Sequence, residues 1–127
     1  MNRTIINTDK APAAIGPYSQ AVRVGDLLFT SGQIPLVPGS MELVTGDIQA
    51  QTKQCMENVK AILEQAGTNM DNCIKLTIFI KDMNQFGAIN EVYGTYFGDN
   101  PPARACVEVA RLPKDVDIEI EAIALVK

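Results

Sequence analysis

Apolar positions recur with the 3.6-residue period of an amphipathic helix in two stretches of the chain. Asp47 can cap the first helix and Gly67 can end it. The second helix is predicted from about Met83 to Phe97, with Asp82 as its cap and Gly98 at its end. The two apolar faces consist of Ile48, Cys55, Met56, Val59, Ile62, Leu63 and Ala66 in the first helix, and of Phe86, Ile89, Tyr93, Tyr96 and Phe97 in the second.

Five strands are predicted from alternating apolar and polar residues. Two of them, Tyr18 to Val24 and Leu27 to Gln33, form a hairpin around a Gly-Asp turn. In the register that this turn sets, Tyr18 faces Gln33 and lies on the same face as Ser31. The other strands are expected at Ile74 to Lys81, Ala103 to Ala110 and Val116 to Val126, with Ile74, Leu76, Ile78 and Ile80 facing the core.

This order of elements predicts one α+β domain over residues 1–127, with two helices packed on one face of a mixed sheet. The last two strands alternate apolar residues with charged ones, and we expect the charged side to face away from the helices. That side carries Arg104, Cys106 and Glu108 from one strand, and Asp117, Glu119 and Glu121, together with Ile123 and Leu125, from the other. Charged groups beside exposed aliphatic groups are typical of a subunit interface with a polar pocket.

Composition narrows the possible chemistry. The chain has no histidine, which excludes histidine-based triads, cysteine–histidine dyads and histidine-ligated metals. Its net charge of −4 disfavours a nucleic-acid binder that depends on a basic stripe. Three widely spaced cysteines fit no zinc or redox spacing and favour reduced thiols in a cytoplasmic protein. No apolar stretch is long enough for a membrane span, and the first 21 residues contain no signal-peptide core.

Several residues in this pattern can carry chemistry, and each has a structural alternative. Arg104 is able to pair across strands with Glu108 or Glu119, or to hold a ligand carboxylate in its planar fork. Glu119 is either a solvated strand carboxylate or a general acid or base. Cys106 is most often a small buried residue in such a position, and without histidine it lacks a base to activate it. Asn90 lies on the apolar side of its helix and needs a polar partner.

Four segments, in order along the chain, resemble motifs of the RidA family, also called YjgF-like. The resemblance covers essentially the whole sequence. The segments are Ala11-Pro12 with Ile15-Gly16-Pro17-Tyr18-Ser19-Gln20-Ala21, Leu28-Phe29-Thr30-Ser31-Gly32-Gln33-Ile34-Pro35, Phe86 with Asn90-Glu91-Val92-Tyr93, and Pro102 to Pro113 followed by Ile118-Glu119-Ile120.

The resemblance implies a chorismate-mutase-like fold and a homotrimer with ligand clefts between its subunits. It also implies a deaminase that hydrolyses reactive 2-imino acids (2-iminobutanoate, 2-iminopropanoate) and their enamine tautomers to 2-oxo acids and ammonia, with no cofactor and no metal. Pyridoxal-phosphate-dependent dehydratases acting on threonine and serine release such imines. Arg104 matches the family's carboxylate-binding arginine, and Glu119 matches the acidic residue linked to the hydrolytic water. Other matching cleft positions are Tyr18, Ser31, Gly32, Asn90 and Cys106, the last through its backbone.

Two other functions stay open at the level of sequence. The same cleft could bind small carboxylates without turnover, as a regulatory protein would. A ribonuclease or translation inhibitor, a role known among relatives, is disfavoured by the net charge of −4 and by the absence of histidine. The combination of Arg104 with Glu119 favours the deaminase.

Overall fold

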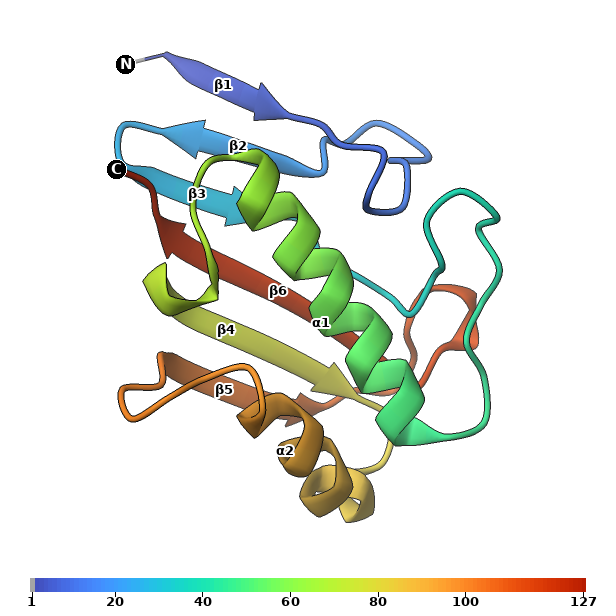
Figure 1. Cartoon of the computed structure of the whole chain (residues 1–127). Coiled ribbons are helices and arrows are strands. Elements are labelled where there is room, and N and C mark those ends of the chain that lie inside the picture. Colours follow the sequence, from blue (N-terminus) through green and yellow to red (C-terminus); the bar gives the residue numbers. More distant parts are fainter. Residues whose placement is uncertain (1) are drawn as a thin grey trace.

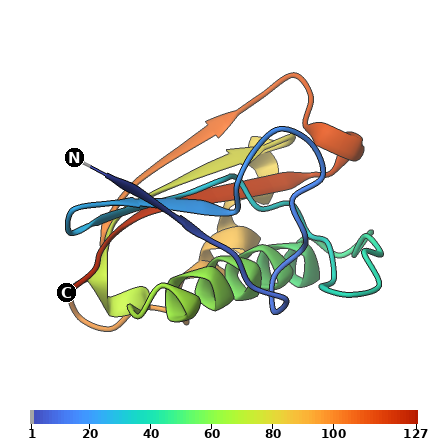
Figure 2. The ribbon, with the colours of Figure 1, turned by 90° about the horizontal axis from the view of Figure 1, so that it is seen from above.

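The computed structural model describes residues 2–127, which form six strands, two α-helices and three short 3-10 helices. Both α-helices lie against one face of a single sheet, and the other face is open (Figures 1 and 2). The strands are β1 (Arg3–Ile6), β2 (Ala21–Val24), β3 (Leu27–Thr30), β4 (Cys73–Ile80), β5 (Ala103–Glu108) and β6 (Ile118–Leu125). The helices are α1 (Ile48–Gln65) and α2 (Phe86–Gly94), and the 3-10 helices are η1 (Met70–Asn72), η2 (Met83–Gln85) and η3 (Pro113–Asp115).

The sheet is mixed, as the element order predicts. Its strand order is β1-β2-β3-β6-β4-β5, and only the β4–β5 pair is parallel. The two longest strands, β4 and β6, lie next to each other near the middle. A parallel pair needs a crossover connection, and α2 together with η2 provides it.

The first helix forms as its pattern predicts. The Asp47 side chain accepts a hydrogen bond from the Gln49 backbone at 3.0 Å, which satisfies one free N–H of the first turn. Gly67 follows the last turn with φ at +88°, a conformation that favours glycine. The core between this helix and the sheet consists of fully buried side chains, including Cys55, Met56, Val59, Ile62, Leu63, Leu76, Ile78, Ile80, Ile118 and Ile120.

The hairpin register is confirmed, but the hairpin is shorter than predicted. Val24 pairs with Leu27 across the turn, and the Ser31 N–H donates to the Gln20 carbonyl at 2.8 Å. Beyond that point the two segments diverge. The Tyr18 N–H donates to the Gly16 carbonyl within a turn, and Gln33 pairs with Ile120 of β6 instead of with Tyr18.

Three further differences from the prediction have local causes. Strand β1 was not predicted, since its four residues are mostly exposed and show no alternation. The second helix is divided into η2 and α2, and it ends at Gly94 instead of near Gly98. Ile74 is 44% exposed because a register shift between Cys73 and Lys75 interrupts the alternation that places Leu76 in the core.

The prediction that the charged residues of the last two strands, together with Cys106, share the open face is wrong for Arg104, Cys106, Glu108 and Asp117. In the parallel β4–β5 pair, Arg104 lies level with Leu76, whose side chain is buried under the helices. Paired residues point to the same face, so Arg104, Cys106 and Glu108 are on the helix side. Asp117 also contacts that layer, since its carboxylate accepts a 2.9 Å hydrogen bond from Gln51 of α1.

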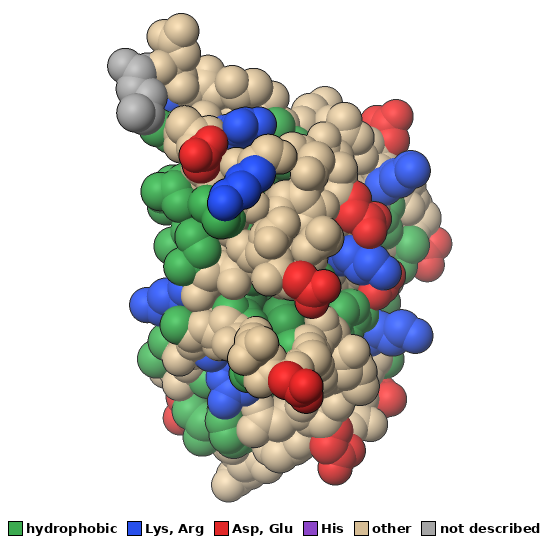
Figure 3. Space-filling view, turned by 60° about the vertical axis from the view of Figure 1, so that its left-hand side comes forward, with side chains coloured by type: hydrophobic (Ala, Val, Ile, Leu, Met, Phe, Trp, Pro, Cys, Tyr) green, Lys and Arg blue, Asp and Glu red, His purple; other side chains and the backbone are tan. Residues whose placement is uncertain are grey.

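The open face is largely apolar and carries two carboxylates, Glu119 and Glu121. The Phe79–Glu119 and Thr77–Glu121 pairs place them level with residues opposite to the core side of β4. Around them lie Ile5, Val22, Val24, Leu27, Phe29, Phe79, Val107, Ile123 and Leu125. Figure 3 shows hydrophobic side chains gathered along the left edge of the molecule, where this face comes into view. An apolar face of this kind is expected to be covered by another protein surface.

Candidate functional site

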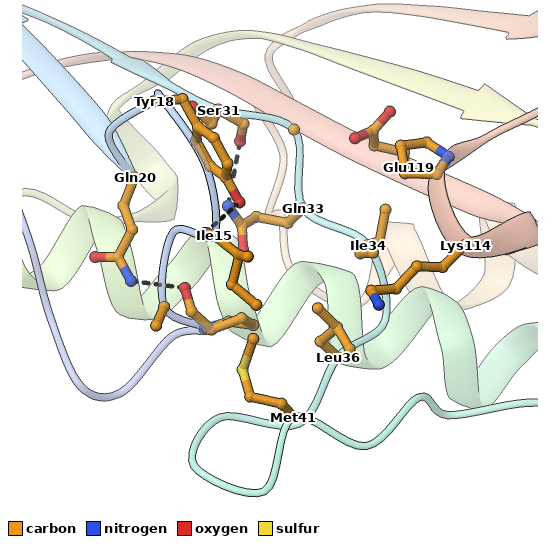
Figure 4. A pocket seen from close by; sticks show the side chains of 14 residues that line it. Ile15, Tyr18, Gln20, Ser31, Gln33, Ile34, Leu36, Met41, Lys114 and Glu119 are labelled. Carbon is orange, nitrogen blue, oxygen red and sulfur yellow. Dashed lines mark hydrogen bonds between the residues drawn. The ribbon is translucent and has the colours of Figure 1, made fainter.

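A cavity of about 450 Å³ lies at the end of the sheet where β3 leaves it and β6 enters it. The segment before β2, the segment after β3 and the turn η3 form its walls (Figure 4). Four of the predicted site residues, Tyr18, Ser31, Gly32 and Glu119, line this cavity. The volume exceeds that of a four-carbon acid several times over, so the cavity has room for a substrate and for water.

Glu119 is the acidic group of the cavity. It lies on β6, half-buried, and its side chain passes close to Gly32. Burial raises the pKa of Glu119 above its ordinary value, and the neighbouring carboxylate of Glu121 raises it further. A carboxyl group of raised pKa in a cavity is suited to exchange a proton with water or with a bound ligand.

Ser31 and Tyr18 lie together on the other side of the cavity (Figure 4). The Ser31 hydroxyl donates to the Ser19 carbonyl at 2.6 Å, so toward a ligand its oxygen can act as an acceptor. The Tyr18 hydroxyl accepts a long hydrogen bond of 3.4 Å from the Ile15 N–H, and the Tyr18 side chain is 51% exposed. The Ser31 oxygen can therefore accept a hydrogen bond from an N–H group or a water, and the Tyr18 O–H can donate one to a bound ligand or a water.

The remaining walls are mostly apolar, with one ammonium group. Ile15, Ile34, Leu36 and Met41 face the cavity, and Lys114 extends into it from η3. Lys114 adopts a left-handed backbone conformation, with φ at 55°. In Figure 4 its ammonium points away from the Glu119 carboxylate, so the two charged groups are not paired.

Arg104 lies elsewhere, at the outer edge of the sheet beside α2. Its guanidinium carbon is 5.1 Å from the centre of the Phe86 ring and 5.0 Å from that of the Tyr93 ring. One of its terminal nitrogens donates to the Asn90 side-chain oxygen. The predicted need of Asn90 for a partner is thus met by Arg104, and the predicted pairing of Arg104 with a glutamate across strands is not found. Two rings and an amide orient a guanidinium that is still exposed to solvent.

Cys106 lies two residues after Arg104 on the same side of β5. Burial raises the pKa of its thiol, and the nearby Arg104 charge offsets only part of this increase. The thiol is therefore protonated at neutral pH, which makes it a poor nucleophile. The role of Cys106 through its backbone stays a prediction.

The predicted site residues thus form two groups on opposite faces of the sheet. Tyr18, Ser31, Gly32 and Glu119 surround the cavity, whereas Arg104, Asn90 and Cys106 lie beside α2. Arg104 is two strands and three residues along the sheet from Glu119, so their Cα atoms are roughly 14 Å apart at ordinary strand spacings. One small acid cannot contact both side chains of the same chain.

Sequence reasoning missed two parts of this arrangement. Phe86 and Tyr93 were predicted only as apolar helix positions or family motif, yet they hold Arg104 between them. Lys114 directly follows the Leu-Pro motif but was not selected, although it enters the cavity. The spacing of Phe86, Asn90 and Tyr93 at i, i+4 and i+7 on one helix face would have indicated a shared partner.

Among residues 2–127, no helix is both long enough and apolar enough to cross a membrane. The same part of the chain contains no group of three or more cysteine, aspartate or glutamate side chains placed to hold a metal ion.

Comparison with known proteins agrees with the motifs. The family model described as endoribonuclease L-PSP matches residues 8–126. A RutC family protein of Pyrococcus abyssi is 56% identical over 124 residues, 98% of each chain, and one of Haemophilus influenzae is 56% identical over the full length of both.

Solved structures give the same result. The crystal structure of E. coli TdcF with bound serine matches with a TM-score of 0.93 and 51% identity, covering 98% of this chain and 99% of that one. YyfA of Yersinia pestis, a protein of the conserved Rid family, matches with a TM-score of 0.96 and 48% identity, covering 98% and 100% of the two chains. Taken with the matching motifs, these similarities show that the chain belongs to the RidA (YjgF-like) family.

Proposed function

We propose that this protein is a deaminase that hydrolyses 2-imino acids, such as 2-iminobutanoate and 2-iminopropanoate, to 2-oxo acids and ammonia. The observation that carries the proposal is the combination of two groups. One is a half-buried carboxyl of raised pKa, Glu119, in a cavity. The other is an exposed guanidinium, Arg104, oriented by two rings and an amide. A 2-imino acid needs both a carboxylate-binding group and a group that handles protons at the neighbouring carbon.

We further propose that the site is completed by a second copy of the chain in a homotrimer. The two groups lie on opposite faces of one sheet, roughly 14 Å apart by strand spacing. The open apolar face carries Glu119 and is of the kind that a neighbouring subunit covers. In a closed ring, the cavity of each subunit can receive Arg104 of the partner subunit. Such an assembly agrees with the chorismate-mutase-like trimer that the family resemblance implies.

The reaction needs few groups because an iminium carbon is already electrophilic. Arg104 of the partner subunit holds the substrate carboxylate through two parallel hydrogen bonds and thereby fixes the position of the imine carbon. The oxygen of a water molecule attacks that carbon, and Glu119 accepts a proton from this water. The resulting carbinolamine takes up this proton at nitrogen. The C–N bond then breaks as the hydroxyl proton passes to Glu119 and the carbonyl forms, and the departing ammonia takes that proton from Glu119 to leave as ammonium. In this proposal, the hydroxyls of Ser31 and Tyr18, which both line the cavity, orient the N–H or the water.

A second function is favoured by one observation. E. coli TdcF has been crystallised with bound serine, a small amino acid that carries a carboxylate. A protein with this site could bind such a ligand as a signal without converting it. In that case the ligand is recovered unchanged after incubation with the protein.

A coupled reaction tests the proposed activity. A pyridoxal-phosphate-dependent threonine dehydratase releases the imine, which semicarbazide traps unless it is hydrolysed first. We expect the rate of semicarbazone formation from the imine to fall when this protein is added, and 2-oxobutanoate to form faster. An unchanged trapping rate, together with saturable binding of serine or 2-oxobutanoate, would favour the binding protein. Activity on RNA that survives removal of Arg104 would indicate a contaminant or a different site.

A further inference from the structure

The side chain of Glu119 crosses the backbone of Gly32 at unusually close range. A Cβ atom added to Gly32 would lie 2.6 Å from Oε2 of Glu119, 2.8 Å from its Cδ and 3.0 Å from its Cγ. These distances are below ordinary van der Waals contact, so Glu119 occupies the space that any side chain at position 32 would need. The contact involves the carboxylate itself and not only the stem of the side chain.

Neither backbone is free to move away from this contact. The Gln33 N–H donates to the Ile120 carbonyl at 2.7 Å, and the Ile120 N–H donates back to Gln33 at 3.0 Å. This pair joins the residue after Gly32 to the residue after Glu119. Ser31, on the other side, is held by its N–H bond to Gln20. The segment is therefore fixed on both sides of Gly32.

Backbone conformation does not explain the glycine. The glycines with left-handed φ are Gly16, Gly25, Gly39, Gly46 and Gly67, and Gly32 is not among them. An alanine could adopt the Gly32 backbone without strain in φ. Position 32 requires a residue without a side chain, because the Glu119 carboxylate occupies the space that a side chain would fill.

We propose that Gly32 is a positioning residue for Glu119: the absence of a side chain lets the carboxylate lie across the backbone and reach the cavity. The inference rests on the proposed function, in which Glu119 handles the proton of the attacking water. A methyl group at position 32 forces the carboxylate into another rotamer, away from the water, while the carboxylate-binding arginine is untouched. The expected signature is a loss in kcat with little change in the binding of a non-reacting 2-oxo acid.

A double-mutant cycle with Gly32→Ala and Glu119→Ala tests this role. In the parent background, Gly32→Ala should lower kcat for imine hydrolysis about tenfold to a hundredfold and lower the melting temperature. In the Glu119→Ala background the space beside Gly32 is empty, so the added methyl group should lower neither kcat nor the melting temperature any further. Gly87→Ala is the matched control: Gly87 lies in α2 with nothing within 4 Å of the added Cβ and ordinary φ, so the variant should retain parent activity and melt at the same or a slightly higher temperature, because alanine favours a helix.

The outcomes separate the positioning role from the proposed function. If Gly32→Ala does not fold but the double variant folds like Glu119→Ala, the clash with Glu119 is supported. If both Gly32→Ala proteins fail to fold, the methyl group meets something else and the inference is wrong. If Glu119→Gln abolishes turnover while Gly32→Ala has near-parent kcat, only the positioning role is lost. If Glu119→Gln turns over normally, the proposed function is wrong. If Gly32→Ala lowers the melting temperature by the same amount in the parent and in the Glu119→Ala background, the methyl group does not clash with Glu119 and the inference is wrong.

Discussion

The two halves of the proposed site are built in opposite ways. The Glu119 half is concave, and turns and segments distant in sequence bring its residues together. The Arg104 half lies on the outer strand of the sheet, where a single helix orients the guanidinium. Glu119 is half-buried and its pKa is raised, whereas Arg104 remains exposed.

Under the proposed function, this difference divides the catalytic work between the two halves. Desolvation tunes a carboxyl that must gain and lose a proton, so Glu119 belongs in a recess. A guanidinium stays charged in any surroundings and needs only a fixed orientation, so Arg104 can project from an edge toward another molecule. The proposed hydrolysis of an imino acid requires both halves, because one handles the proton and the other binds the carboxylate.

Removing the proton-handling half should have the largest effect. Glu119→Gln keeps the size of the side chain but cannot accept a proton, so we expect kcat to fall about 10²-fold to 10⁴-fold. The dissociation constant of a non-reacting 2-oxo acid, measured by calorimetry, should change much less. An equal loss in binding and in turnover would mean that Glu119 holds the substrate instead of handling its proton.

Weakening the carboxylate-binding half should have the next largest effect. Lysine keeps the charge of Arg104 but offers a point donor on a flexible stem, so the substrate loses its fixed angle. We expect Arg104→Lys to reduce activity on the order of a hundredfold or more while the trimer stays intact by light scattering. Near-parent hydrolysis by Arg104→Lys would make this residue structural and the assignment of the site wrong.

The raised pKa of Glu119 predicts a pH-dependent stability difference. Because the folded state raises this pKa, folding favours the protonated carboxyl, and the stabilising contribution is lost as pH rises through the folded value. Glutamine stays neutral throughout. Glu119→Gln should therefore melt at a higher temperature than the parent near pH 7, with the difference disappearing in acid below the ordinary carboxyl range. A lower melting temperature at both pH values would contradict the raised pKa.

The smallest effect is expected at Cys106. Its thiol is protonated and lacks a base to activate it, so Cys106→Ser should retain activity within a few-fold of the parent in the same trapping assay. Alkylation is not a fair substitute for this variant, because added bulk could block the cleft. Complete inactivity of a folded Cys106→Ser protein would mean that the thiol takes part in the reaction.

Sequence predicted the parts of this molecule that depend on local patterns. The helix α1, with its Asp47 cap and Gly67 end, and the Val24–Leu27 hairpin register follow from spacing and turn chemistry. Alternation also showed correctly that Arg104 and Ala105 point to opposite faces. It could not show which of the two residues points toward the helices, because that depends on the parallel pairing of β5 with β4.

The residue types in the family motifs predicted the site better than the strand faces inferred from alternation did. Family motifs selected Tyr18, Ser31, Gly32 and Glu119, and these do surround one cavity. The expected single charged face was wrong, however, since Arg104 lies on the helix side. In the proposed trimer the completing residues come from another copy, and no pattern within one chain reveals a site divided in this way.

Mixing two inactive variants tests the shared site most directly. Glu119→Gln and Arg104→Lys are refolded together in equal amounts, so that subunits assemble at random into trimers. Three quarters of such trimers contain both variants, and each of these has one site of three with both native residues, so about a quarter of parent activity should return. The separately refolded variants, combined only afterwards, serve as the control. If the mixture is no more active than these controls, Glu119 and Arg104 do not act across a subunit boundary, and the account of a site shared between two chains is wrong.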